Sequence, residues 1–157
     1  MRKSKNVLAF HEEVTVGPLV SSFTTEDLTT QPYLAVDLHP ELLEAVEADP
    51  TEAVKFRSFE LVRGASNLNI QKELPAENCE AALWQAALLT GNQKNGEQGS
   101  LTTEFGRANL FFLADCVIRV WWDGTQRVWN IRDWDPGMGY WEKGDRIFCP
   151  VDPRLLQ

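Results

Sequence analysis

The chain lacks the short motifs that mark common enzyme classes, and it has only two histidines, His11 and His39. It contains no GxGxxG, GxxxxGK[ST], GxSxG or HExxH pattern. Adjacent strand residues point to opposite faces, so His11 and Glu12 are not expected to share a site. His39 precedes Pro40 and is expected to cap a helix. We therefore expect no catalytic residues, and the pattern favours a binding protein over an enzyme.

Lysine and arginine are absent from residues 6–54, and ten acidic residues lie in that stretch. Nucleic-acid binding depends on cations that neutralise phosphates, so the stretch predicts a protein that does not bind nucleic acid. A solvated acidic face is the simplest interpretation, and attraction of a basic protein surface is a second. An acidic protein that mimics nucleic acid and so inhibits a DNA-binding partner is a third hypothesis.

Cysteines are few, widely spaced and odd in number: Cys79, Cys116 and Cys149. No CxxC or Cys/His spacing typical of zinc sites occurs. We expect buried free thiols, a reducing compartment and hence a cytoplasmic protein. The apolar stretch 7–10 is too short for a signal-peptide core, and no apolar run is long enough to span a membrane.

Metal and cofactor motifs are missing as well. Four carboxylates lie within 13 residues near the C-terminal end, and oxygen ligands of this kind suit hard cations. Their spacing matches no EF-hand loop, and Lys143 and Arg146 are interleaved with them. We expect neither a metal site nor a cofactor. The carboxylates are Asp133, Asp135, Glu142 and Asp145.

Length and patterning predict one domain over residues 1–157, because 157 residues with 43% hydrophobic content suffice for a single core. Strands are predicted at 14–16, 33–36, 53–62 and 145–149, with 68–74 as a hairpin partner of 53–62. Helices are predicted from Pro40 to about Asp49 and over 76–90. The fold class is therefore α+β: a twisted antiparallel sheet of about five to seven strands, a roll or half-open barrel, with two helices packed on one face. An SH3-like or split barrel is the alternative.

Tryptophan is abundant, and five of the six tryptophans lie within residues 121–141. Asp123-Gly124 separates two β-rich runs, which predicts a hairpin with a two-residue type I′ turn. That register places Val120 opposite Arg127 and Asp115 opposite Arg132. One face is continuously apolar and is expected to be the core face, with Trp121 more exposed than Trp122 and Trp129. The apolar residues are Leu110, Phe112, Ala114, Cys116, Ile118, Val120, Trp122, Trp129 and Ile131.

The other hairpin face mixes aromatic and charged residues and is the candidate binding surface. Its predicted site residues are Asp115, Arg119, Trp121, Arg132 and Trp134, with Phe111 and Val117 beside them. Pairing of Asp115 with Arg132 would leave Arg119 free for an anion or a carbonyl. The face is either a half-solvated sheet surface, the concave wall of a ligand pocket, or an interface with a protein partner or a second copy. The leading hypothesis is a non-enzymatic interaction protein, and the alternative is a small-molecule-binding protein or enzyme with a pocket on this face.

Overall fold

The computed structural model describes residues 6–74, 80–135, 137 and 139–151. Its helices are α1 (Thr25–Thr29), α2 (Pro40–Glu44), α3 (Asn67–Glu73) and α4 (Leu83–Gly91). Its strands are β1 (Leu8–Val16), β2 (Leu34–Asp37), β3 (Val54–Leu61), β4 (Ala65–Ser66), β5 (Asn109–Phe112), β6 (Val117–Asp123), β7 (Val128–Trp134), β8 (Tyr140–Trp141) and β9 (Arg146–Pro150).

Seven strands form one mixed sheet in the order β1-β3-β9-β5-β6-β7-β2, and β4 pairs with β8 in a second, two-stranded sheet. The α+β class and the strand number are confirmed. The prediction of an antiparallel sheet is wrong, because β5 pairs in parallel with β9 and β7 in parallel with β2. The sheet ends in two edge strands and is not closed, which rules out the SH3-like and split-barrel alternatives. Local turn signals predict neighbouring hairpins, but they carry no information on strands paired across long sequence distances.

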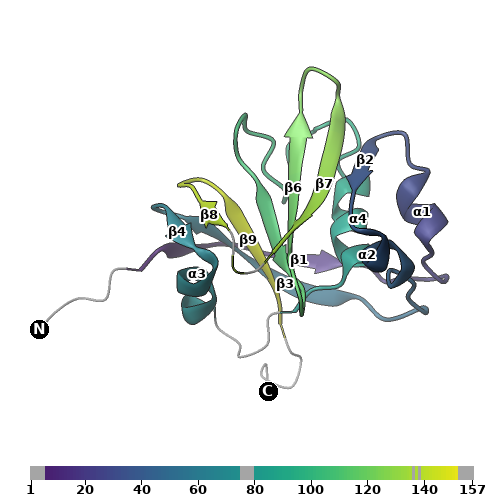
Figure 1. Cartoon of the computed structure of the whole chain (residues 1–157), viewed down its shortest axis with the longest axis horizontal. Coiled ribbons are helices and arrows are strands. Elements are labelled where there is room, and N and C mark those ends of the chain that lie inside the picture. Colours follow the sequence, from purple (N-terminus) through teal and green to yellow (C-terminus); the bar gives the residue numbers. More distant parts are fainter. Residues whose placement is uncertain (1–5, 75–79, 136, 138, 152–157) are drawn as a thin grey trace, which may run out of the picture.

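Both faces of the large sheet are buried in hydrophobic clusters. Alternate residues of β5 show this directly, because Phe111 belongs to one cluster and its neighbours Leu110 and Phe112 to the other. Residues of α1 and α4 pack in the first cluster, and Ile70 of α3 packs in the second. The two predicted helices, α2 and α4, pack on the same cluster. The helix on the opposite face is α3, which was predicted as a strand (Figure 1).

All four helices differ from the prediction, and α2 ends at Glu44 instead of near Asp49. Helix α4 begins at Leu83, where Gln85 Oε1 accepts a hydrogen bond from the Ala82 N–H at 2.8 Å; residues 76–79 of the predicted helix lie outside the described residues. Residues 67–73 form α3 instead of a strand, because Ser66 Oγ caps the helix by accepting from the Asn69 N–H. Helix α1 lies between the predicted strands 14–16 and 33–36, where no element was predicted, and begins with a Thr24–Asp27 capping box.

The β6–β7 hairpin has a four-residue loop instead of the predicted two-residue turn. Asp123 Oδ1 accepts hydrogen bonds from the backbone N–H groups of Thr125 and Gln126, and Arg127 adopts a φ of 58°. Trp122 consequently pairs with Trp129 and Val120 pairs with Ile131. The predicted register is wrong, but the error is four residues, an even number, so each side chain of the hairpin keeps its predicted face.

The chain also turns at residues 113–116, which were predicted as part of one long strand. The Leu113 N–H donates to the Cys116 carbonyl at 2.9 Å, and β5 folds back on β6. Leu110 and Phe112 therefore lie on the face opposite to Ile118 and Val120, whereas Phe111 shares the face of Ile118. Phe111 is fully buried and stacks on Phe148 at 4.9 Å, so it does not contribute to the predicted binding surface.

The cysteine expectation is correct for one residue and wrong for another. Cys116 is free and buried, whereas Cys149 is disulfide-bonded; Cys79 lies outside the described residues. A disulfide-bonded cysteine removes the premise on which the reducing compartment was predicted. Among the helices of the described residues, none is long and apolar enough to cross a membrane.

Candidate functional site

Four of the five predicted site residues gather on one face of the β6–β7 hairpin. Arg119 and Arg132 are direct cross-strand partners, and each arginine lies two residues from a tryptophan on its own strand. The Arg119 guanidinium carbon lies 4.2 Å from the Trp121 ring centroid, and that of Arg132 lies 5.2 Å from the Trp134 centroid. Both distances are in the range of cation–π contacts. We call these four residues the Arg/Trp face.

Asp115 does not join the Arg/Trp face. It is exposed in the turn between β5 and β6, outside the residues that pair with β7. The carboxylate beside Arg132 is instead Asp37 of β2, whose Oδ2 lies 3.7 Å from Arg132 Nε. Because both side chains are largely exposed, this ion pair contributes little to stability.

Arg119 is half-buried and has no hydrogen-bond or ion-pair partner among the described residues. Burial lowers the pKa of its guanidinium and the charge of Arg132 lowers it further, while Asp145 opposes the shift. Asp145 is engaged elsewhere, since its two carboxylate oxygens accept from the backbone N–H groups of Ala108 and Glu142, each at 2.9 Å. The indole Nε1 of Trp134 is also buried without a hydrogen-bond partner. The Arg/Trp face therefore carries donors that nothing in the described chain satisfies.

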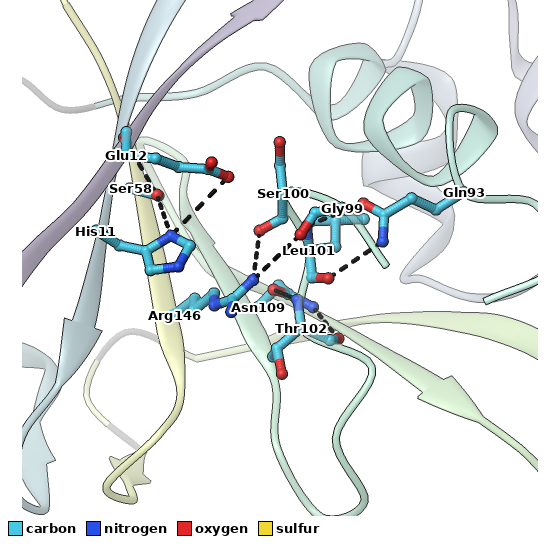
Figure 2. Close-up of polar contacts among 10 residues, drawn as sticks. All are labelled: His11, Glu12, Ser58, Gln93, Gly99, Ser100, Leu101, Thr102, Asn109 and Arg146. Carbon is cyan, nitrogen blue, oxygen red and sulfur yellow. Dashed lines mark hydrogen bonds and ion pairs between the residues drawn. The ribbon is translucent and has the colours of Figure 1, made fainter. Parts of the chain in front are cut away.

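A cavity of about 700 Å³ lies on the opposite side of the sheet, at a place that the sequence did not predict. It is lined by His11, Glu12, residues 98–104 and Arg146. Figure 2 shows side chains from β1 and β9 and the 99–102 loop around the same space. We call this the His/Arg cavity; its volume falls in the usual range of small-molecule sites.

A β-bulge brings His11 and Glu12 together, contrary to the expectation that they point to opposite faces. The β1–β3 register shifts between Phe10 and Glu12, which interrupts the alternation of side chains. His11 Nδ1 lies 3.9 Å from Glu12 Oε1 and 3.3 Å from Ser58 Oγ. No residue pattern in this strand marks the bulge, so sequence reasoning had no signal for the pair.

Two buried amide side chains hold the loop wall of the cavity. Gln93 donates from Nε2 to the Leu101 carbonyl and accepts at Oε1 from the Leu101 N–H. Asn109 repeats this arrangement with Thr102, at 3.1 and 2.8 Å. Each amide bonds to both the N–H and the carbonyl of one loop residue, as a neighbouring strand would. These bonds fix the backbone conformation of the loop wall within the protein itself.

Arg146 and Glu12 present unsatisfied polar atoms at the same cavity. Arg146 Nη1 donates to the Ser100 carbonyl at 2.8 Å and to the Gly99 carbonyl at 3.4 Å. Its Nε, like Glu12 Oε1, is shielded from solvent without a hydrogen-bond partner. No ion pair within 4.0 Å joins Glu12 to Arg146, although their charges are opposite. Buried polar atoms are nearly always paired in native structures, so two of them at one cavity are notable.

The Ser58–His11–Glu12 group is not arranged as a catalytic triad. Ser58 is fully buried, and its hydroxyl donates to the Glu12 carbonyl at 3.2 Å. The Ser58 hydroxyl and the Glu12 carboxylate both face Nδ1 of His11. In a catalytic triad, one imidazole nitrogen faces the serine and the other faces the carboxylate. The arrangement can orient an imidazole, but it does not present an activated nucleophile.

Metal binding has no geometric support in the part of the chain that the structure describes, where no three His, Cys, Asp or Glu side chains gather. A scan against protein-family models matches no family, and searches of curated proteins and of solved structures find no significant similarity.

Proposed function

We propose that this protein is a non-enzymatic interaction protein whose Arg/Trp face binds a protein segment that presents carboxylates. The single observation that carries the proposal is the direct cross-strand pairing of Arg119 with Arg132. Like charges directly opposite each other destabilise a sheet, so this arrangement costs folding free energy in the unbound protein. A carboxylate placed between the two guanidinium groups removes the repulsion.

The chemistry of the face suits a carboxylate better than other groups. Arginine holds carboxylates through two parallel N–H···O bonds, and these charge-assisted bonds are stronger than neutral ones. Trp121 and Trp134 lie within cation–π distance of the two arginines and contribute aromatic surface beside them. Tryptophan and arginine are also the residues most enriched at the energetic centres of protein interfaces.

The shape of the face favours a protein segment over an enclosed small molecule. Arg132 of the face is exposed and lies on β7 beside the edge strand β2, whereas the His/Arg cavity is lined by other residues. An extended segment laid across β6 and β7 would meet both arginines at once.

Fluorescence anisotropy of a labelled hexaglutamate peptide tests the proposal. We expect saturable binding to the protein that weakens as salt is raised, because the attraction is between charges. Arg119→Gln and Arg132→Gln should each weaken binding by about tenfold, the effect of losing one charge-assisted hydrogen bond. Arg63→Gln is the matched control, since Arg63 is an exposed arginine outside the hairpin, and it should leave binding unchanged.

Two further measurements separate the alternatives. Hexaserine and hexalysine peptides should not bind through the arginines, and sedimentation velocity reports whether a second copy occupies the face. Equal binding by wild type and Arg119→Gln, or an equal loss in Arg63→Gln, would contradict the proposal. Self-association that Arg119→Gln abolishes would replace the acidic partner with a second copy of this chain.

A further inference from the structure

We infer that the His/Arg cavity is a second, independent binding site for a small zwitterion of the α-amino-acid type. The inference does not depend on the Arg/Trp face, because the two sites lie on opposite faces of the sheet. It rests on the two unsatisfied polar atoms, the orientation of His11 and the rigid loop wall.

The guanidinium of Arg146 defines the anionic end of the ligand. Its Nη1 is committed to the carbonyls of Ser100 and Gly99, which leaves the Nε edge for another acceptor. Nε is buried without a hydrogen-bond partner, and Arg146 lines the cavity. A carboxylate fits such an edge through two parallel hydrogen bonds.

Glu12 and His11 define the cationic end. Ser58 Oγ gives its proton to the Glu12 carbonyl, so it acts as an acceptor toward His11 Nδ1. The carboxylate oxygen of Glu12, 3.9 Å from Nδ1, favours the same proton position. A proton on Nδ1 is therefore directed at Ser58 and Glu12, so groups of the protein itself hold the imidazole beside the Glu12 carboxylate. Figure 2 shows the second ring nitrogen turned away from Ser58.

An ammonium group placed at this end donates to the Glu12 carboxylate, while the carboxylate of the same ligand accepts from Arg146. A simple anion would leave Glu12 unpaired, and a simple cation would leave Arg146 unpaired.

The remaining lining residues favour a small polar side chain on this ligand. Ser100, Thr102, Thr103 and Gln98 supply hydroxyl and amide groups, and Glu104 adds a second carboxylate at the rim. Polar groups in a prearranged wall recognise hydroxyl or amide substituents by hydrogen bonds. Large apolar side chains should therefore bind less well than those of serine, glutamine or asparagine.

Titration of ¹⁵N-labelled protein with L-serine, L-glutamine and L-leucine, followed by two-dimensional NMR, tests the inference. We expect serine or glutamine to shift the backbone amides of residues 98–104 in a saturable manner. Acetate and methylamine each carry one of the two charges and should bind at least about tenfold more weakly. This comparison uses only the wild-type chain, so it does not depend on any variant folding.

Glu12→Gln should reduce the affinity by about tenfold, because it removes the charge and keeps the size of the side chain. Glu13→Gln is the matched control: Glu13 neighbours Glu12 on β1, pairs with Lys55 and does not line the cavity. The inference would be contradicted if acetate bound as tightly as serine, or if the chemical shifts changed only outside residues 98–104. It would also be contradicted if no shifts changed up to about 50 mM amino acid, a weak-binding limit. None of these results bears on hexaglutamate binding at the Arg/Trp face.

Discussion

Replacement of Trp129 by alanine should destabilise the fold far more than the same change at Trp121. Trp129 is fully buried, its indole Nε1 donates to the Gln93 carbonyl at 2.7 Å, and its ring meets Trp122 edge to face. It therefore links β7 to Gln93, whose side chain holds the loop wall of the His/Arg cavity. Trp121 lies on the Arg/Trp face, is half-buried, and contacts Arg119.

The magnitude follows from what each change removes. Truncation of a fully buried tryptophan costs about 3–5 kcal/mol, and for a domain of this size that corresponds to a fall in Tm of roughly 6–20 °C. Trp121→Ala loses a cation–π contact of about 0.5–1 kcal/mol and part of its apolar burial, so about 1–2 kcal/mol in total.

Urea unfolding followed by far-UV circular dichroism measures both losses on one scale. Trp129→Phe is the control for the hydrogen bond, because it keeps an aromatic ring and removes the indole N–H. It should fall between wild type and Trp129→Ala. Equal losses for Trp121→Ala and Trp129→Ala would refute the assignment of the two hairpin faces.

Three other predictions concern stability away from the binding surfaces. Gly96→Ala should lower Tm more than Gly106→Ala does. Both glycines have a positive φ, 71° and 77°, but only at Gly96 would an added Cβ meet a neighbour, at 2.3 Å from the Trp122 side chain. Equal falls in Tm would refute this contact. Burial raises the pKa of the Cys116 thiol from 9.0 to about 11. The buried neutral thiol therefore contributes fully to the free energy of unfolding below pH 9, and this contribution is lost as the pH rises toward 11. Unfolding free energies at pH 8 and 10.5 should show this loss in wild type but not in Cys116→Ala, and an identical pH dependence would contradict it. Asp145→Asn should lower the free energy of unfolding, measured in urea, by about 1–3 kcal/mol, because an amide offers one acceptor oxygen where two backbone N–H groups require two. An unchanged urea midpoint would show that the carboxylate is dispensable.

The faces of the β6–β7 hairpin could be predicted from the sequence, but its register could not. The alternation of apolar and polar residues depends only on parity, so Arg119, Trp121, Arg132 and Trp134 were placed together correctly. The register depends on the loop, and Asp123 caps a four-residue loop where Asp-Gly favours a two-residue turn. The partner of Arg132 was missed for a different reason: Asp37 lies on a strand 95 positions earlier that joins the sheet in parallel.

The His/Arg cavity could not be predicted at all. Its histidine and glutamate meet only because a bulge breaks the alternation on which the prediction rested. Arg146 joins them through the pairing of β9 with β3, which no local pattern encodes. The disulfide of Cys149 was missed because widely spaced cysteines show no pairing signal.

The indole N–H resonances of the tryptophans test the central claim most directly, because tryptophans lie both on the Arg/Trp face and in the core. During titration with the glutamate peptide, the indole signals of Trp121 and Trp134 should shift, while those of buried Trp84 and Trp129 stay fixed. The two shifts should be lost together in Arg119→Gln. Shifts of the core indoles alone, or unchanged signals from Trp121 and Trp134 while the peptide binds, would contradict binding at the Arg/Trp face.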